Sequence, residues 1–262
     1  MKIAYFGFDL FYGCLEKIRD CNNEIIKIFT CKVDGVYETS DKVYAFAKKY
    51  NIDITEDKPS LDDIIKLKEA GCELLFSAGY YHKIPGTDLI LGLNIHPAML
   101  PIGRGPWPQP VTILKSLSTT GVSLHILADK FDTGDIVIQI PFSVAEDDNL
   151  ETLNQKYTAA AIEALGMFFS DPDKNLENTI VQGLGEYWPE PSRDKMTFSV
   201  FDEYEKIDRI TRAFYGYICY MKNGVSVRKI IKSFCTRVEP IKCSNYDVIR
   251  INDGWLVILK YA

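Results

Sequence analysis

Two polar side chains capable of acid–base chemistry stand close together near the middle of the sequence. In the stretch LNIHPAMLPIGRGPWPQP (93–110), Asn94 and His96 end a short apolar run. Side chains two residues apart on a strand point to the same side, so both are expected to face one space. Histidine exchanges a proton near neutral pH, and an asparagine amide is a neutral donor for a developing oxyanion. The pair predicts a site where a proton moves and negative charge develops on oxygen.

The segment after this pair is stiff. Pro97 and Pro101 fix the backbone angle φ, whereas Gly103 and Gly105 permit angles that other residues avoid. A rigid loop beside an amide and an imidazole favours catalytic geometry over simple packing.

A carboxylate partner for the histidine is expected in the turn KFDTGD (130–135). Asp132 stands at the tip of this turn, where it can reach inward. A carboxylate beside an imidazole fixes its tautomer and stabilises its cation. An aspartate before Thr-Gly is also an ordinary turn former, and a single histidine in a strand is commonly structural. His125, in the middle of VSLHIL, is interpreted in that structural way.

The elements that must position these residues alternate between strand and helix patterns over the first two-thirds of the chain. This alternation predicts an α/β fold with a Rossmann-like, twisted, mostly parallel sheet. Ligands bind at the carboxyl ends of such strands. The short turn 130–135 leaves a hairpin open as the alternative for the last two strands. Strands are expected at 2–8, 24–31, 73–78, 92–95, 121–127 and 135–140, and helices at 12–21, 40–51, 60–71, 110–118 and 150–169, with Ser40 and Ser60-x-x-Asp63 as caps.

A change of character near residue 185 predicts a domain boundary. The polar stretch EYWPEPSRD (186–194) carries two prolines. We therefore expect a catalytic domain over residues 1–185 and a small, β-rich α+β domain over residues 186–262. In the second domain a helix is expected at 203–216, followed by strand-like runs at 225–234, 246–251 and 254–261.

Composition narrows the class of protein. The 262 residues carry a net charge of −6, which argues against a protein that coats nucleic acid. No stretch approaches the ~20 apolar residues that cross a bilayer, and the start of the chain does not read as a secretory signal. The seven cysteines are odd in number and contain no C-x-x-C pair, so neither a disulfide framework nor a zinc site is indicated. A cytoplasmic protein with reduced thiols is expected.

Three motifs, in order along the chain, carry a family resemblance. LNIHPAMLPIGRGPWP, GVSLHILADKFDTGDIVIQ and DDNLETL resemble the 10-formyltetrahydrofolate-dependent formyltransferases, whose pattern runs Asn-x-His-Pro, Gly-(Val/Cys)-Thr-(Val/Leu)-His, Asp-x-Gly-x-Ile-x-x-Gln and Asp-Thr-x-x-x-Leu. The likeness covers about residues 1–170. The departures are Ala98, Met99 and Asn149, where the family usually has Ser, Leu and Thr.

The resemblance implies roles for the three polar residues. An amine attacks the formyl carbon of 10-formyltetrahydrofolate, and no metal takes part. His96 would act as base toward the amine, Asn94 would donate to the oxyanion, and Asp132 would orient or charge-balance His96.

The resemblance also implies binding residues for donor and acceptor. Tyr81, Lys83 and Ile84, in the segment 76–85 expected to grip the pterin, would bind the folate together with Leu100 and Ile102. The two apolar residues are equally well read as ordinary core. The amine substrate is placed near Phe8, Asp9, Ser77, Arg104 and Trp107.

Features outside the core favour one subfamily. The chain continues for some 80 residues past the long helix, unlike glycinamide ribonucleotide transformylases, and its first strand begins at residue 2, unlike formyltetrahydrofolate hydrolases. RGPWP (104–108) looks most like the nucleotide-sugar enzymes. The expected substrate is a nucleotide-linked amino sugar in surface polysaccharide biosynthesis. The family resemblance also indicates a homodimer. Neither nucleic acid nor a membrane is expected as a partner.

Other functions stay open. Methionyl-tRNA formyltransferase is the alternative within the family, although those enzymes carry a larger, basic C-terminal domain. A non-catalytic folate or sugar binder is the alternative from another class. A nicotinamide-binding enzyme is disfavoured because GFDLFYG (7–13) lacks the glycine spacing that admits a pyrophosphate. A metal hydrolase is disfavoured because His82, His96 and His125 have no ligand spacing.

Overall fold

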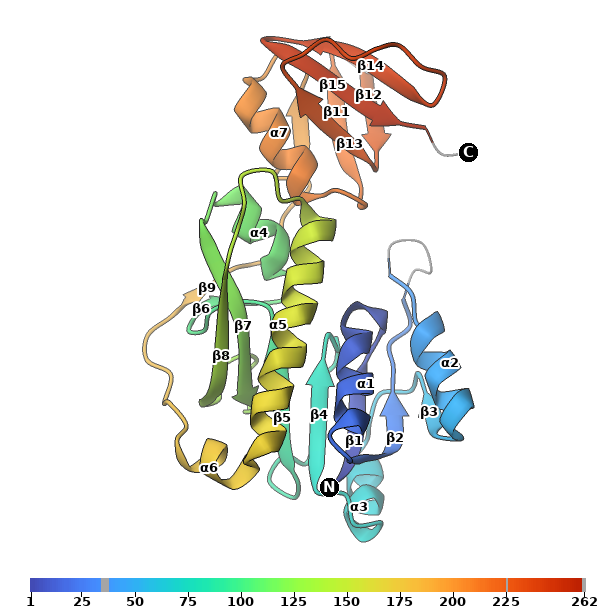
Figure 1. Ribbon diagram of the computed structural model, residues 1–262, viewed down its shortest axis with the longest axis vertical. Coiled ribbons are helices and arrows are strands. Elements are labelled where there is room, and N and C mark those ends of the chain that lie inside the picture. The colour runs from blue at the N-terminus through green and yellow to red at the C-terminus, as the bar shows by residue number, and fades with distance from the viewer. Residues whose placement is uncertain (34–37, 225, 261–262) are drawn as a thin grey trace. The chain divides into compact units, whose positions relative to one another are not determined.

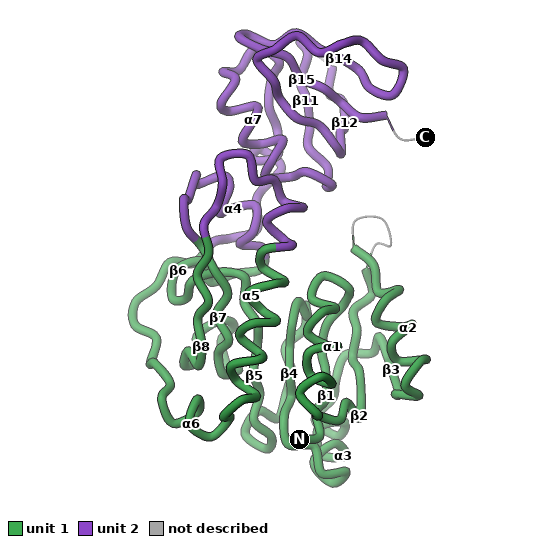
Figure 2. Tube along the Cα trace, in the orientation of Figure 1, with its two compact units in different colours: residues 1–106, 120–142, 156–187 green, residues 107–119, 143–155, 188–262 purple. Residues whose placement is uncertain are grey.

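The computed structural model describes residues 1–33, 38–224 and 226–260. Val225 and Tyr261, each at one end of an expected strand, lie outside the described residues. The chain divides into two compact units, coloured separately in Figure 2. Unit 1 contains residues 1–106, 120–142 and 156–187, and unit 2 contains residues 107–119, 143–155 and 188–262.

A seven-stranded sheet forms the centre of unit 1 (Figure 1). Its strand order is β3-β2-β1-β4-β5-β7-β8, and the first five strands are parallel to one another. β5 and β7 pair antiparallel. The predicted α/β fold with a mostly parallel sheet is confirmed. The strands are β1 (Lys2–Gly7), β2 (Glu24–Phe29), β3 (Asp53–Thr55), β4 (Leu74–Ala78), β5 (Leu91–His96), β7 (Thr119–Ile126) and β8 (Ile136–Ser143).

The strands β1 and β4 are buried along almost their whole length because helices cover both faces of a parallel sheet. All five residues of β4 are buried, as are Ile3 to Gly7 in β1. On one face, Ile64 and Leu67 of α3 join a core cluster with Phe6. The helical elements of unit 1 are the short 3-10 turn η1 (Asp9–Phe11), α1 (Tyr12–Asp20), α2 (Asp41–Tyr50), α3 (Leu61–Glu69), α6 (Pro172–Glu177) and, from residue 156 onward, α5 (Leu150–Ser170).

Helix α5 shows why an amphipathic pattern was visible in the sequence. The side chains of Tyr157, Ala161, Ala164, Leu165 and Phe168 are fully buried. These positions recur every three or four residues, so they form one stripe along the helix.

The hairpin alternative for the last two strands of the sheet is the one the structure adopts. β7 and β8 are neighbours, and the backbone N–H of Ile126 donates to Asp135 O at the turn. No side chain fits at Gly134, where an added Cβ would lie 1.9 Å from Ile126 O. The hairpin turn thus holds the segment that carries Asp132.

The two predicted helix caps differ in outcome. Ser60 and Asp63 form the expected capping box at the start of α3. The Ser40 side chain makes no cap bond to α2 and instead bonds Thr30 Oγ1 at 3.1 Å. The Asp9 carboxylate takes the cap's place, accepting from the N–H groups of Lys42 and Val43. A residue 33 positions away cannot be recognised as a cap from local sequence.

Unit 2 is small and β-rich. It contains two three-stranded sheets, ordered β10-β11-β12 and β13-β15-β14. The expected strand 225–234 is two strands, β12 and β13, separated by Ile231 and Lys232. The elements are α4 (Pro108–Leu114), β10 (Thr197–Ser199), α7 (Tyr204–Ala213), β11 (Cys219–Asn223), β12 (Ser226–Ile230), β13 (Ser233–Thr236), β14 (Tyr246–Ile251) and β15 (Gly254–Leu259), while β6 (Ile102–Arg104) and β9 (Glu186–Tyr187) pair within unit 1.

No helix among the described residues is both long enough and apolar enough to span a bilayer.

Candidate active site

The carboxyl end of β5 carries Asn94 and His96. β5 lies between β4 and β7, and its register sets Asn94 opposite Ser77 on one side and His125 on the other. His96 is the last residue of the strand and is 4% exposed. Because β1, β4 and β5 run in parallel, the chain segments that leave all three strands begin at this same edge.

His96 and Asp132 lie against each other. Nδ1 of His96 is 3.4 Å from Oδ1 of Asp132, with side-chain exposures of 5% and 10%. Nε2 of His96 is 2.8 Å from the carbonyl oxygen of Gly103. A carbonyl only accepts hydrogen bonds, so Nε2 carries a proton and donates it. Both ring nitrogens thus face oxygen, and the arrangement offers an acceptor to each N–H of an imidazolium ring.

Asp132 has an unusual backbone conformation, and its carboxylate makes a second contact within the site. Its φ is +57°, in the left-handed region that costs most residues about 1–2 kcal/mol and that aspartate tolerates better. Oδ2 accepts a hydrogen bond of 2.9 Å from the backbone N–H of Gly105. One carboxylate oxygen therefore contacts the loop that follows His96, and the other faces the imidazole.

His125, interpreted from sequence as structural, belongs to this cluster. Its Nδ1 donates to the carbonyl of Ile126 at 2.9 Å, which leaves Nε2 as an acceptor. That nitrogen lies 3.0 Å from Nδ2 of Asn94, so the asparagine amide donates to it, and 3.8 Å from Oδ1 of Asp132. Burial, followed by the neighbouring His96, lowers the pKa of His125 to about 4, although Asp132 opposes this shift. A neutral His125 orients the Asn94 amide.

Two further residues that the sequence reasoning missed hold the loop after His96. The Ser123 hydroxyl donates to Ala98 O at 2.7 Å and accepts from the N–H of Leu100 at 3.0 Å. The Gln139 amide donates to Leu100 O and to Ser123 Oγ. Gln139 closes the motif DTGDIVIQ, which was the signal available for it in the sequence.

Arg104, expected to bind substrate, contacts the protein itself. Its guanidinium donates twice to Oε1 of Gln182, at 2.8 and 3.1 Å, and once to the carbonyl of Gly183. The Gln182 amide nitrogen donates to the carbonyls of Asp132 and Gly134. Gln182 was not recognised from sequence, where no motif marks it.

The residues expected to hold folate fall into buried and exposed members. Ile84 and Leu100 are buried, while Ile102 and Tyr81 are exposed. Lys83 forms an exposed ion pair with Asp129 at 3.7 Å. Residues 82–84 make no backbone hydrogen bond to other described residues. Their free N–H and C=O groups beside an apolar side chain fit a pterin ring, which is flat and carries donors and acceptors on its edge.

The residues expected near the amine substrate have different surroundings. Phe8 is buried, and its ring lies 5.2 Å from that of Tyr81. A residue expected to contact the amine substrate is therefore next to a residue expected to bind folate. Ser77 is also buried. The Asp9 carboxylate accepts from Thr39 Oγ1 at 2.8 Å in addition to capping α2. Trp107 belongs to unit 2, where its ring packs against Phe214 and Tyr217.

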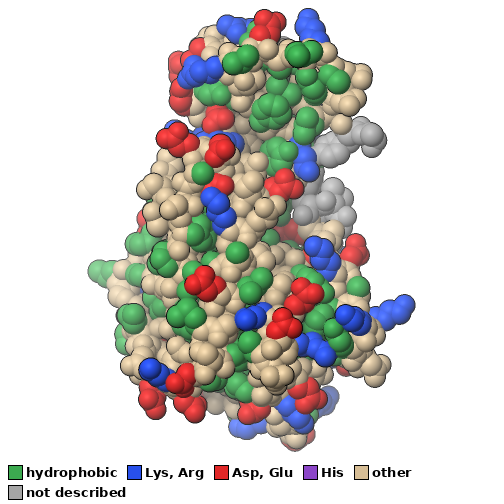
Figure 3. Space-filling view, in the orientation of Figure 1, with side chains coloured by type: hydrophobic (Ala, Val, Ile, Leu, Met, Phe, Trp, Pro, Cys, Tyr) green, Lys and Arg blue, Asp and Glu red, His purple; other side chains and the backbone are tan. Residues whose placement is uncertain are grey.

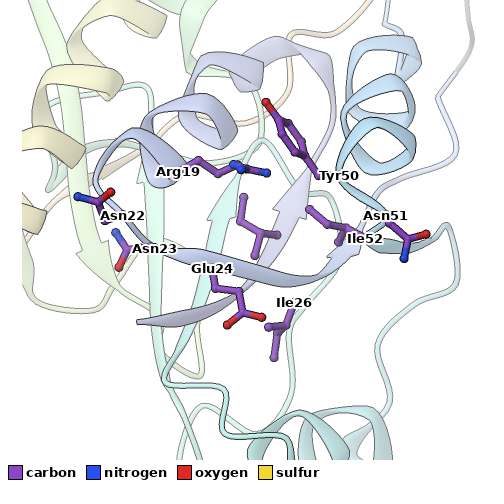
Figure 4. Close-up of a pocket in the computed structure, with 9 residues that line it drawn as sticks. Arg19, Asn22, Asn23, Glu24, Ile26, Tyr50, Asn51 and Ile52 are labelled. Carbon is purple, nitrogen blue, oxygen red and sulfur yellow. The ribbon is translucent and has the colours of Figure 1, made fainter.

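A separate hollow of about 490 Å³ lies at the opposite edge of the sheet (Figure 4). It is bordered by the first residues of β2, by Ile52 just before β3, and by the ends of α1 and α2. Arg19 stacks over the Tyr50 ring at 3.4 Å there. None of the expected site residues lines it. Within the described part of the chain, no group of three or more His, Cys, Asp or Glu side chains is arranged to hold a metal ion.

Comparison with known proteins decides the family. Residues 17–167 match the family model described as formyl transferase, which is more than half of the chain. The chain belongs to the formyl transferase family. The match includes Asn94, His96, Asp132 and His125, and it ends before Gln182.

Curated relatives of the chain include methionyl-tRNA formyltransferases. A methionyl-tRNA formyltransferase of Prochlorococcus marinus is 26% identical over 192 residues, which is 69% of this chain and 58% of that protein. The chain thus matches somewhat over half the length of such curated relatives.

Solved structures share the fold over nearly the whole chain. HypX from Aquifex aeolicus, in complex with tetrahydrofolic acid, has a TM-score of 0.74 at 12% identity, covering 98% of this chain and 43% of that one. The N-formyltransferase from Helicobacter canadensis, in complex with folinic acid and dTDP-3-aminofucose, has a TM-score of 0.67 at 20% identity, covering 99% of each. At these identities the likeness establishes the fold.

Proposed function

We propose that this formyl transferase moves a formyl group from 10-formyltetrahydrofolate to the amine of an amino sugar that is linked to a nucleotide. The observation that carries the proposal is the contact between His96 and Asp132, 3.4 Å apart and largely shielded from water, with the Asn94 amide on the same strand. A proton carrier, a carboxylate and an amide donor are the groups that transfer of an acyl group to an amine needs.

The folate would be held by the segment after β4 and by the loop after His96. Free backbone groups at 82–84, with the buried side chains of Ile84 and Leu100, support this placement. When bound, 10-formyltetrahydrofolate supplies a formyl group activated for attack by an amine.

Residues of the chain itself would stabilise the negative charge and transfer the protons. Asn94 gives one amide hydrogen to His125, and its second remains for the oxygen that becomes negative. The amine nitrogen loses a proton as it forms its new bond, and Nδ1 of His96, the ring nitrogen that faces Asp132, takes it up. His96 returns a proton to the departing nitrogen, so no net proton is gained or lost by the His96–Asp132 pair. The Gly103 carbonyl and the Asp132 carboxylate keep the ring in place during both transfers.

An amino sugar is favoured over an aminoacyl-tRNA on two grounds. The chain carries a net charge of −6, and acidic and basic side chains are interspersed over the face drawn in Figure 3. A protein that grips a tRNA backbone usually offers a basic surface. The Helicobacter canadensis protein, whose complex contains dTDP-3-aminofucose, also matches this chain end to end.

Formylation of methionyl-tRNA is the second candidate. It is favoured by the name of the Prochlorococcus relative, which aligns with 69% of this chain.

A direct test incubates the purified protein with 10-formyltetrahydrofolate and a panel of nucleotide-linked amino sugars, and measures acceptor mass. We expect one acceptor to gain a single formyl group. Formylation of charged initiator tRNA alone would identify formylation of methionyl-tRNA, the second candidate, as the activity of the protein. Absence of transfer to any amine, together with measurable folate binding, would make it a non-catalytic binder.

A further inference from the structure

The segment 180–187, called the strap here, lies beyond the part of the chain that matches the family model. Ile180 exchanges two backbone hydrogen bonds with Ile136 at the start of β8. At the other end, Glu186 N–H donates to Pro101 O, and β9 pairs with β6. The strap therefore joins the hairpin that carries Asp132 to the loop that follows His96.

Gln182 lies between these two anchors, and both the nitrogen and the oxygen of its side-chain amide form hydrogen bonds. Nε2 donates to the carbonyls of Asp132, at 3.1 Å, and Gly134, at 2.6 Å. Oε1 accepts both hydrogen bonds from Arg104. An amide has two donors and one acceptor oxygen, so all of its groups are engaged. Neither a carboxylate nor an aliphatic side chain of the same size can make this set of contacts.

The backbone that Gln182 grips is the one with unfavourable geometry. Asp132 has its φ at +57° and needs surrounding contacts to stay there. From that backbone position its carboxylate reaches both Gly105 N–H and His96. Arg104, the other partner of Gln182, immediately precedes Gly105.

We propose that Gln182 is a positioning residue, which with Arg104 holds the Asp132 carboxylate between Gly105 and His96. This inference rests on the proposed formyl transfer for its kinetic consequences, but not for its structural ones. It also assigns Arg104 to the support of Asp132 in place of the expected contact with the amine substrate.

The test compares Gln182→Met, Gln182→Glu and Arg104→Met with a matched control, Leu184→Ala, whose side chain on the same strap is fully exposed. Hydrogen exchange of the Gly105 amide, followed by NMR, reports the Asp132 contact without any turnover. We expect both Gln182 variants to speed this exchange at least tenfold and to lower kcat about tenfold, while KM for the amine stays within twofold. Gln182→Glu keeps an acceptor for Arg104 but loses both donors.

Arg104→Met should reproduce the Gln182→Met effects, and the double variant should be no worse than either single one, because the two residues act as a unit. The proposal is overturned if Gly105 exchange in Gln182→Met matches wild type, or if Arg104→Met raises KM for the amine with Gly105 exchange unchanged. If wild type transfers no formyl group, the exchange result still decides the positioning role, so the two failures are distinguishable.

Discussion

The Asn94 amide donates to Nε2 of His125 at 3.0 Å, and the donor–acceptor direction is fixed by the bond from His125 Nδ1 to Ile126 O. A neutral His125 is thus built into the candidate site beside a histidine, His96, whose two nitrogens both face oxygen. We propose separate tasks for these two imidazoles on adjacent strands. One orients an amide, and the other carries a proton.

The pH dependence of stability follows from His125. Its pKa, about 4 in the folded protein, lies below the ~6.5 of an unfolded chain, so the unfolded state binds more protons between these values. Stability should therefore fall as the pH falls from about 6.5 to 4, by on the order of 3 kcal/mol from this group. Urea unfolding at pH 7 and pH 4.5 checks this. The loss should be smaller in His125→Gln, and equal losses in both proteins would contradict the assignment.

Removing the charge at position 132 should separate chemistry from binding. Asp132→Asn keeps an oxygen that can accept from Gly105 but cannot charge-balance His96. We expect kcat to fall about a hundredfold, with KM for the amine changed less than threefold. Steady-state kinetics gives both values. Asp173→Asn, on the exposed start of α6, serves as the control and should behave as wild type. An Asp132→Asn variant with wild-type kcat would remove the carboxylate from the mechanism.

The Ser123 hydroxyl should matter for stability as well as for the site. Ser123→Ala leaves the Leu100 N–H and the Gln139 amide without their shared acceptor in a buried region. Unsatisfied buried groups cost about 1–3 kcal/mol, so the free energy of unfolding should drop by about 2 kcal/mol. Urea denaturation measures it, with the exposed Ser118→Ala as the control. A loss no larger than the control's would show that the loop is held by other contacts.

Asp9 offers a choice between a structural and a substrate-binding role. Its carboxylate accepts from Thr39, Lys42 and Val43, so Asp9→Ala should destabilise the protein by about 1 kcal/mol, the usual cost of losing a helix cap. KM for the amine should stay within twofold. Thermal or urea unfolding and steady-state kinetics provide the two measurements. An unchanged stability with a large rise in KM would support the substrate-binding role expected from sequence.

Local patterns in the sequence were sufficient for four of the five parallel strands, the capping box at Ser60 and the shared direction of Asn94 and His96, but not for the short strand β3. Each of the predicted features depends on neighbours within a few residues. The pairing of Asn94 with His125 depends on the register between β5 and β7, which no local pattern fixes. The Asp9 cap and the Gln182 contacts join segments 33 and about 50 positions apart. Such contacts are set by tertiary packing, so sequence periodicity could not predict them.

His96 is the proposed proton carrier for formyl transfer to an amine, and the other roles in the site depend on it. The measurement that tests it most directly follows a ¹³C-labelled formyl group from 10-formyltetrahydrofolate to the acceptor identified in the panel, under single-turnover conditions, in wild type and His96→Ala. We predict transfer by wild type and a rate at least a hundredfold lower in His96→Ala, with folate affinity retained. Equal transfer rates in the two proteins would contradict the account.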